Sequence, residues 1–408
     1  MDTPDLLILG LDPQGLEIGL AVATLGGQVI VARSAESALA QAVRDGELLA
    51  RLVSASDATA FALRRAAVVE DIRRQRSDER LRAARIRVTQ EPVRFLDHRR
   101  VAIGEATLRP RRILLASGVE PNGPLAELNA LFEHGTVPHR LVLNGSTVMA
   151  LDLASLLIRL GTEVTLVSDG PLAPECDPDG LRLLLDRLRR QGLVVANAMP
   201  ARGDADIPVW TLGEPRPALD GFDLAKFGVQ LRGGFQTSRS HVFAIGRLAE
   251  PGALPDPGAV AHLVGRMFFR RSARYAPRPR LRLAGGQSGL AEIGLTEAQA
   301  LARGKVQVAR AAFAPGDPAD FSGGFVKLLA DRKGRLLGAS LFGPGAAEAA
   351  ALLSLALAQG LGLADLARQP GAPGTASEAI AVAAASPARR FLRSGSVQRA
   401  FRYFRLLG

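Results

Sequence analysis

The sequence predicts an α/β protein in which two βαβ units are followed by an α+β domain, and three observations support this prediction. Residues 6–33 read in the order apolar strand, tight turn, helix and second apolar strand, which is the pattern of a βαβ unit. The same order recurs in residues 139–170. After residue 277, strand-like runs alternate with an alanine- and leucine-rich helical run, which indicates a third domain of α+β type.

The composition is that of a globular chain with several domains. The 408 residues are 47% hydrophobic, which is enough for two or three domains with their own cores. The formal net charge is +11, but the basic residues are mostly arginines spread along the chain, so the charge alone does not indicate a nucleic-acid partner. No apolar run reaches the roughly 18 residues of a membrane span, and no signal peptide precedes the first strand. We therefore expect a cytoplasmic protein.

Cysteine and histidine usage limits the possible chemistry. The single cysteine, Cys176, lies in a stretch rich in proline, aspartate and glycine that is typical of a loop. One cysteine excludes an internal disulfide and a cysteine metal cluster. Cys176 could still be a reactive thiol or a residue with no chemical role. The histidines show no HExxH or HxH spacing; they are His98, His134, His139, His241 and His262. We predict no metal site.

The turn after the first strand contains Gly10, Asp12 and Gly15. In dinucleotide-binding turns, glycines let backbone N–H groups approach a pyrophosphate at the N-terminus of the next helix. Asp12 would set a carboxylate beside the phosphates, and unit charges about 4 Å apart repel by roughly 4 kcal/mol at an effective dielectric constant near 20. Alternatively, Asp12 only caps the helix that begins near Pro13. Under either interpretation we expect the turn to exclude pyrophosphate.

Further elements follow in a recognisable order. The run "RRILLASGVEPNG" has the form of a buried strand that ends in a small-residue turn, and "HVFAIGRLAE" repeats that form after the second βαβ unit. A proline- and arginine-rich linker surrounds Tyr275. Beyond it, "GFVKLLADRKGRLLGASLFG" predicts two strands, and residues 346–359 predict a helix.

Taken together, these segments resemble the flavoprotein disulfide reductases, the pyridine nucleotide-disulfide oxidoreductase family that includes dihydrolipoamide dehydrogenase, glutathione reductase and mercuric reductase. The sequence "LLASG" stands at the family's ATG turn, "TLGEPRP" at its GR-P turn and "VFAIGR" at its AIGD strand. The runs "AEIGLTEAQA" and "GTASEAI" follow the family's carboxy-terminal domain. The chain looks like a degenerate member near mercuric reductase and dihydrolipoamide dehydrogenase. The resemblance implies two Rossmann-like nucleotide-binding domains plus a C-terminal α+β dimerisation domain.

The resemblance also implies domain boundaries and a homodimer formed through the C-terminal domain. The predicted parts are an FAD-type domain at 1–138 that resumes at 216–276, an NAD(P)-type domain at 139–215, a dimerisation domain at 277–386 and a basic aromatic tail at 387–408.

Residues at three flavin-contacting positions of the family have changed charge. Arg33 ends the second strand, where the family has an acidic residue that accepts hydrogen bonds from ribose, and Arg247 follows Gly246 in place of an aspartate. The small-residue turn after the third strand keeps Ser117 and Gly118. Together with the aspartate in the first turn, the two arginines lead us to expect that FAD is lost and that the chain binds no cofactor.

The second βαβ turn departs less from the family pattern. Gly145 is kept, whereas Thr147 and Ala150 stand at glycine positions and Ser168 ends the strand that normally closes with an acid. The Cβ of Thr147 would hinder close approach of a phosphate. We predict an impaired nicotinamide-nucleotide site, in which these small residues serve mainly helix-to-strand packing.

The family's redox residues have no counterparts in this sequence. Residues 34–56 contain no CxxxxC pair, so dithiol exchange of the family type is excluded. The family motif HPTxSE is matched by "PGTASE", with Pro373 at the histidine position. Glu378 lacks that histidine, and we expect it to be a solvated residue or a helix cap. We assign no catalytic residue.

Three functions are consistent with this reading. The leading hypothesis is a pseudoenzyme retained as a dimeric binding or regulatory protein. The second is an FAD-dependent NAD(P)H oxidoreductase that passes electrons to oxygen, a quinone or a metal without a disulfide. In the third, the remodelled cleft binds another anionic metabolite or a nucleotide through Arg33 and Arg247.

The tail after Pro387 is basic and aromatic. It contains six arginines and no acidic residue, interleaved with phenylalanine, leucine and valine. Such a segment can form an amphipathic helix on an anionic membrane or bind a protein partner, or it can fold back on its own domain, and Gly395 with its flanking serines interrupts the helix. We do not expect nucleic-acid binding, because no recognised binding fold accompanies these residues.

Overall fold

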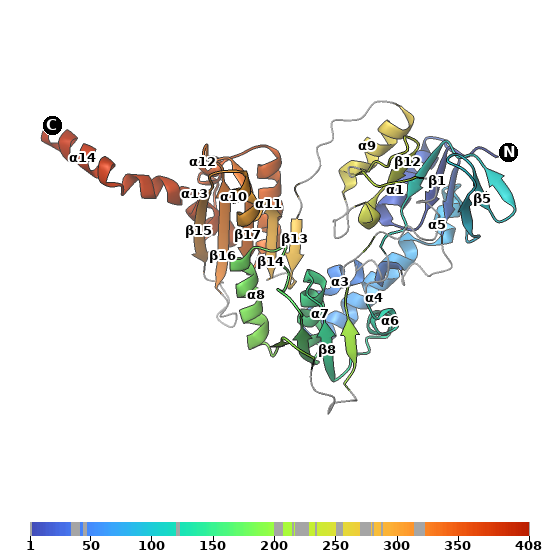
Figure 1. The fold of residues 1–408 in the computed structure, drawn as a ribbon, viewed down its shortest axis with the longest axis horizontal. Helices are drawn as coiled ribbons and strands as arrows, with labels where there is room; N and C mark the ends of the chain where they lie inside the picture. The colour runs from blue at the N-terminus through green and yellow to red at the C-terminus, as the bar shows by residue number, and fades with distance from the viewer. Residues whose placement is uncertain are drawn as a thin grey trace. The chain divides into compact units, whose positions relative to one another are not determined.

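The computed structural model divides the chain into two compact units (Figure 1). Unit 1 comprises residues 1–145, 159–163 and 200–277, and unit 2 comprises residues 146–158, 164–199 and 278–408. The structure describes residues 2–33, 41–43, 47–119, 123–199, 207–213, 216, 228–232, 235–249, 256–269, 279, 281–286, 289–313 and 323–407.

A five-stranded parallel sheet forms the centre of unit 1. Its order is β12-β7-β1-β2-β3, and every pair of neighbours is parallel. The strands are β1 (Leu6–Leu9), β2 (Val29–Ala32), β3 (Arg87–Thr89), β7 (Arg112–Leu115) and β12 (Val242–Ala244). From β1 the chain continues to β2 and β3 on one side of the sheet and then to β7 and β12 on the other. Such a switch point marks where doubly wound sheets bind ligands, at the carboxyl ends of the strands.

Both faces of this sheet are buried, which explains why β1 is apolar at every position. Leu6 and Ile8 pack in one core with α1 (Pro13–Thr24) and α9 (Pro257–Phe268). Leu7 and Leu9 pack in a second core with an antiparallel three-stranded sheet. That sheet consists of β4 (Val93–Phe95), β5 (Val101–Ile103) and β6 (Ala106–Leu108).

The remaining elements of unit 1 are helical except for one strand pair. The helices are α3 (Glu47–Leu52), α4 (Ala58–Gln75), α5 (Asp78–Ala83), α6 (Leu125–His134) and the 3-10 helix η4 (Gly246–Leu248). Strands β8 (Arg140–Asn144) and β11 (Val209–Thr211) pair in parallel.

Unit 2 contains an antiparallel sheet covered by helices. The sheet order is β13-β14-β17-β16-β15, built from β13 (Leu281–Ala284), β14 (Leu290–Gly294), β15 (Gln307–Phe313), β16 (Gly324–Ala330) and β17 (Leu336–Phe342). Its core is shared with α11 (Ala346–Ala358), α12 (Leu363–Leu366) and α13 (Ala376–Leu392). Helix α10 (Glu297–Arg303) follows β14, and α14 (Gly395–Leu407) ends the chain.

The other segments of unit 2 come from the middle of the chain. They are α7 (Val148–Arg159), β9 (Glu163–Val167), α8 (Pro178–Arg190) and β10 (Val194–Ala196), with β9 and β10 paired in parallel. Among the helices that the structure describes, none is long and apolar enough to cross a membrane.

The predicted fold class is confirmed: parallel α/β sheets are combined with a C-terminal α+β domain. The two strands expected in residues 324–343 are β16 and β17, and the expected alanine-rich helix is α11. The structure runs α13 through Pro387 to Leu392 and begins a new helix at Gly395. The linker around Tyr275 and residues 34–40 and 44–46 lie outside the described residues, and the domain boundaries stay predictions.

Candidate nucleotide-binding site

The turn after β1 brings three strand ends into close packing. Gly10 has a φ of +109°, and a Cβ added there would lie 2.1 Å from the Ala116 carbonyl oxygen after β7. A Cβ on Gly15 would lie 2.7 Å from the Ala116 Cβ. Only glycine satisfies both the positive φ and the close approach at Gly10. These two glycines therefore hold the start of α1 against the sheet.

Asp12 is the N-cap of α1, so the predicted capping role is confirmed. Its Oδ1 accepts a hydrogen bond of 3.0 Å from the Gln14 backbone N–H, and its own N–H donates to the Ala116 carbonyl at 3.1 Å. The side chain is 5% exposed. A Cβ on Gly246, which has a φ of +66°, would lie 2.0 Å from Asp12 Oδ2. The carboxylate therefore lies between the first turn of α1 and the turn after β12.

The other residues predicted for the flavin site lie at the ends of neighbouring strands. Arg33 follows β2, Ser117 and Gly118 follow β7, and Arg247 follows β12 within η4. Because the carboxyl ends of parallel neighbours share one edge of a sheet, these residues gather at the edge where doubly wound folds bind ligands. Arg33 also forms an ion pair with Asp78 of α5, with Nη2 3.2 Å from Oδ2.

Buried donor atoms of unit 1 that have no hydrogen-bond acceptor among the described residues include Nε2 of Gln14, Nε of Arg33, Nε2 of Gln41 and Nε of Arg65. Leaving a buried donor unsatisfied costs about 1–3 kcal/mol, and buried polar groups in native proteins nearly always find a partner. Gln14 is the second residue of α1 and Arg33 directly follows β2. Such donors would be satisfied by a ligand rich in acceptor oxygens.

Sequence reasoning identified Arg33 but missed Gln14 and Gln41. For Gln14, the available indication was a glutamine in the first turn of the helix, between Pro13 and Gly15. The oxygens of a dinucleotide pyrophosphate and ribose have the chemistry that these donors require. The donor set and the glycine turn thus fit FAD at this edge.

The residues predicted in the second βαβ turn make local backbone contacts. Ala150 N–H approaches Thr147 Oγ1 at 3.4 Å at the start of α7, and Ser168 Oγ donates to the Gly170 carbonyl at 2.8 Å. Gly145 belongs to unit 1, whereas Thr147, Ala150 and Ser168 belong to unit 2. The two hydroxyls therefore serve the turns in which they lie.

Cys176 is buried in the loop before α8. Burial, followed by the charges of Glu292 and Glu175, raises the pKa of its thiol far above the ordinary range. A thiol needs its deprotonated form to act as a nucleophile. Cys176 therefore stays protonated and unreactive at neutral pH.

The segment matching the family's HPTxSE motif forms a helix start. Thr375 is the N-cap of α13, and Glu378 accepts a 2.7 Å hydrogen bond from the Gly374 N–H. Pro373 lies in the loop that precedes this cap. In the structure, Glu378 contributes to the cap of α13.

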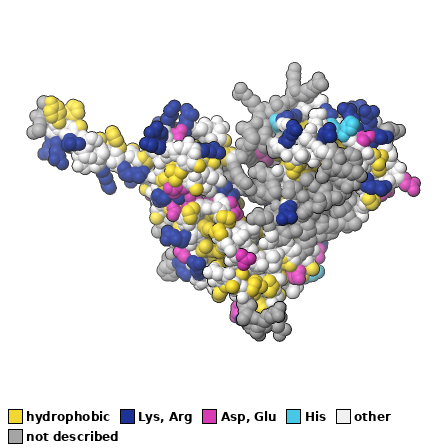
Figure 2. Space-filling model, viewed as in Figure 1, with side chains coloured by type: hydrophobic (Ala, Val, Ile, Leu, Met, Phe, Trp, Pro, Cys, Tyr) yellow, Lys and Arg dark blue, Asp and Glu magenta, His cyan; other side chains and the backbone are white. Residues whose placement is uncertain are grey.

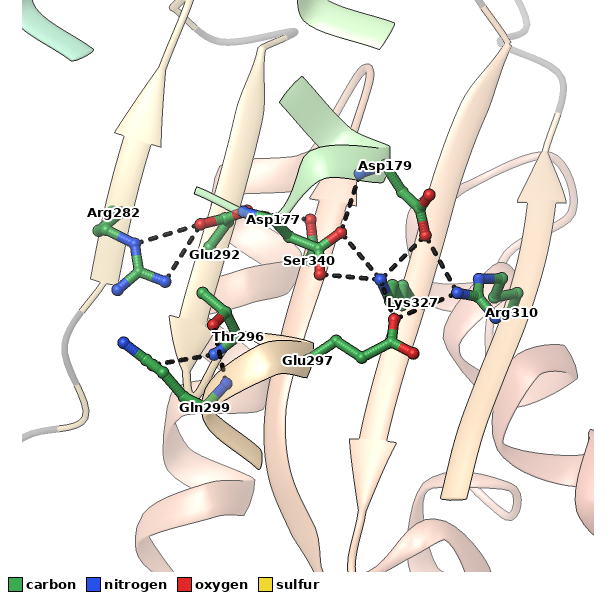
Figure 3. Close-up of polar contacts among 10 residues, drawn as sticks. All are labelled: Asp177, Asp179, Arg282, Glu292, Thr296, Glu297, Gln299, Arg310, Lys327 and Ser340. Atoms are coloured by element: carbon green, nitrogen blue, oxygen red, sulfur yellow. Dashed lines mark hydrogen bonds and ion pairs between the residues drawn. The ribbon is translucent and has the colours of Figure 1, made fainter. Parts of the chain in front are cut away.

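A buried charge cluster in unit 2 was not found from the sequence (Figure 3). Lys327 of β16 is 1% exposed, and its Nζ lies 2.8 Å from Asp177 Oδ2 and 2.9 Å from Asp179 Oδ2. Glu297 of α10 is a third partner of the same ammonium. Burial alone would lower the pKa of Lys327, but the hydrogen bonds to these three carboxylates raise it. The lysine is therefore charged and binds α8 and α10 to the sheet.

Glu292 of β14 extends this cluster. It accepts hydrogen bonds from the Asp177 N–H at 2.7 Å and from Arg282 Nε at 3.1 Å, and Ser340 Oγ lies 3.3 Å away. Burial raises the pKa of Glu292, while the bonds to Asp177 and Arg282 oppose that rise. Every buried member has partners, as a stabilising polar network requires.

Comparison with known proteins finds a matching protein family and several relatives of this chain. Residues 287–384 match the family model for the pyridine nucleotide-disulphide oxidoreductase dimerisation domain. The chain is 26% identical over 313 residues to dihydrolipoyl dehydrogenase of Bacillus subtilis (strain 168), covering 64% of this chain and 67% of that protein. It is 26% identical over 330 residues to mercuric reductase of Streptomyces lividans, covering 69% of each.

The fold also matches solved structures. The HOCl-induced flavoprotein disulfide reductase RclA from Escherichia coli aligns with a TM-score of 0.76 at 17% identity, over 93% of this chain and 99% of that one. The parallel sheet with its glycine turn and the C-terminal antiparallel domain define a nucleotide-binding oxidoreductase architecture. Within that class, the comparisons support the predicted resemblance to the flavoprotein disulfide reductases: residues 287–384 match the family's dimerisation domain, and the relatives and the fold cover most of the chain.

The expectation that the chain binds no cofactor is wrong. Its relatives are flavoprotein disulfide reductases that use FAD with NAD(P)H. The sequence argument held that the turn excludes pyrophosphate whether the Asp12 carboxylate faces the phosphates or only caps the helix. In the structure the carboxylate accepts the Gln14 N–H and lies against Gly246, so this hydrogen bond compensates part of the charge that the sequence argument took to exclude the cofactor.

Proposed function

We propose that the chain is an FAD-dependent NAD(P)H oxidoreductase that reduces its acceptor without a redox disulfide. The observation that carries this proposal is a pair of buried donors beside the first nucleotide turn, Gln14 Nε2 in α1 and Arg33 Nε after β2, which have no acceptor among the described residues. A bound FAD would supply acceptor oxygens to them. The Gly10 turn and the N-terminus of α1 would hold the pyrophosphate.

The absence of a dithiol limits the class of acceptor. The 408 residues contain one cysteine, and its thiol is buried with a raised pKa. FAD, when bound, takes an electron pair from NAD(P)H and supplies it to the acceptor. An acceptor such as a quinone fits, since NAD(P)H, a proton and the quinone yield NAD(P)+ and the hydroquinone without sulfur chemistry. Oxygen and metal ions are the other acceptors to be screened.

A homodimer is part of the same proposal. The C-terminal domain matches a dimerisation domain, and α11 exposes the large apolar side chains Leu352 and Leu355. Val382 of α13 is exposed as well. Isologous contact with a second copy would bury such side chains.

The first experiment measures FAD binding and its dependence on Gln14. We expect the purified protein to carry flavin or to bind added FAD, and Gln14→Leu to weaken that affinity about 10- to 100-fold, because a hydrogen bond to a charged group is worth about 1.5–3 kcal/mol. Gln359→Leu, at an exposed position outside this site, is the matched control. Equal affinities for all three proteins would contradict the assigned role of Gln14.

The second experiment measures NAD(P)H oxidation with quinone, oxygen and metal-ion acceptors. Turnover that is unchanged in Cys176→Ala supports chemistry without a thiol. The pseudoenzyme hypothesis predicts no turnover with any acceptor. Loss of turnover in Cys176→Ala with retained FAD content would contradict a disulfide-independent reaction.

A further inference from the structure

The last two helices carry apolar side chains that the chain itself does not cover. The first half of α13 buries Ala379, Ile380 and Ala383 in the core of the C-terminal domain. Beyond Pro387 the pattern changes, and the ring of Phe391 is exposed. One hydrogen bond from Arg390 to the Val308 carbonyl ties this end of α13 to β15.

Helix α14 has two chemically different faces. At 100° per residue, Val397, Phe401 and Phe404 lie within about 60° of one another on one side of the helix; Arg399 and Arg402 lie on the other side, and Arg405 lies at the border between the two. Phe401 is 68% exposed and Phe404 is 71% exposed. The three arginines of α14 are also exposed; they are Arg399, Arg402 and Arg405. Figure 2 shows hydrophobic and basic side chains along this C-terminal helix.

We propose that α14 binds the surface of an anionic lipid bilayer. No acidic residue follows Glu378, while six arginines do, so the segment complements a negatively charged surface. Exposed aromatic side chains on the opposite face provide the apolar area that enters the headgroup boundary. The 13 residues of α14 extend about 20 Å at 1.5 Å per residue and lie along such a surface rather than across it.

The other binding partners considered for α14 would complement only its basic side or only its apolar side. A nucleic acid would neutralise the arginines but would leave Phe401 and Phe404 in water. A second copy of the helix in isologous contact would bring like charges together. An anionic bilayer satisfies both faces at once.

The experiment is co-sedimentation of the full chain with vesicles. Vesicles of phosphatidylcholine with about one third phosphatidylglycerol are compared with pure phosphatidylcholine at low salt. We expect binding to the anionic vesicles and little to the neutral ones. Replacing the three arginines of α14 with glutamine should weaken binding roughly 100-fold, since each arginine near the surface contributes about 1 kcal/mol, or roughly a fivefold factor.

Two further variants separate the contributions of the faces. Phe401→Ser with Phe404→Ser should weaken binding at least tenfold by removing apolar area. The matched control replaces three exposed arginines of α4 and α5, Arg64, Arg73 and Arg80, with glutamine, which removes the same charge from unit 1. Its binding should change by less than about threefold, because these arginines lie outside the helix that we propose contacts the bilayer.

Insertion of α14 into the bilayer can be measured separately, by tryptophan fluorescence. Phe401→Trp adds an indole to a chain whose single native tryptophan, Trp210, is buried. The fluorescence emission of the indole at position 401 should shift to the blue when anionic vesicles are added, because the ring enters an apolar environment. It should not shift when a short DNA duplex is added. The proposal is overturned if wild type does not bind anionic vesicles, if the α14 variants bind as wild type does, or if DNA binds through the arginines while vesicles do not.

Discussion

Lys327→Met should destabilise the C-terminal domain by several kcal/mol. The lysine is 1% exposed and bonds to Asp177, which is 2% exposed, and to Asp179. Methionine has a similar length and no charge. The substitution would therefore leave a buried carboxylate without its cation, which is the costly way to disrupt a buried ion pair.

The size of the effect follows from these contacts. Two ion pairs with N to O distances of 2.8 and 2.9 Å each supply roughly 6 kcal/mol at an effective dielectric constant near 20. Because methionine carries no charge, folding of the variant no longer includes the desolvation penalty of a buried ammonium group, which reduces the net loss of stability by several kcal/mol. The expected net loss is about 3–5 kcal/mol, in line with measured losses of one partner from buried pairs. Adding Asp177→Asn should recover part of this loss, because asparagine still caps α8.

Amide hydrogen exchange of peptides covering β16 is the suitable assay, because a multidomain chain need not unfold in two states. Arg310→Met is the control: its side chain is 48% exposed, although it pairs with the same Asp179. We expect the control to lose less than about 1 kcal/mol of local stability. If Lys327→Met loses as little as Arg310→Met, the assigned role of the buried cluster is wrong.

Four more predictions concern other positions. Gly10→Ala should lower the melting temperature and the soluble yield, because it combines a φ of +109° with a backbone clash at 2.1 Å; an unchanged melting temperature would show that the turn can relax. Cys176 should react with a thiol reagent far more slowly than in unfolded protein, since burial raises its pKa; fast reaction in the folded state would contradict this. Leu352→Glu with Leu355→Glu, at exposed sites of α11, should convert a dimer to a monomer in light scattering, and a dimer that persists would place the interface elsewhere. The hydrogen bond from the buried lysine lowers the pKa of Asp179 from its ordinary 3.8, so its stabilisation is complete above that pH and is lost as pH falls through the lowered value; amide protection that does not decline on acidification would refute this linkage.

Much of the fold could be predicted from local sequence. The run Leu6–Leu9 is apolar at every position, as a strand buried on both faces must be, and Asp12 before Pro13 marks the start of α1. The apolar alternation and turn of residues 324–343 predicted the β16 and β17 pair. Each of these features depends on residues close together in the chain.

The site could be predicted only in part, because its contacts depend on side-chain direction and on distant segments. The sequence indicated that Asp12 could cap α1, but only the structure shows that its carboxylate also lies against Gly246 after β12. Lys327 stands in an apolar strand, and its partner Asp177 is 150 positions away in the sequence. No local pattern connects the two residues.

The absorbance spectrum of the purified protein, before and after incubation with FAD, tests the central claim most directly. We predict flavin bands in proportion to protein after unbound FAD is removed, with bleaching by NAD(P)H and recovery on adding a quinone, in wild type and in Cys176→Ala alike. A protein that retains no flavin after incubation with excess FAD, or one whose flavin NAD(P)H cannot reduce, would contradict the proposed function.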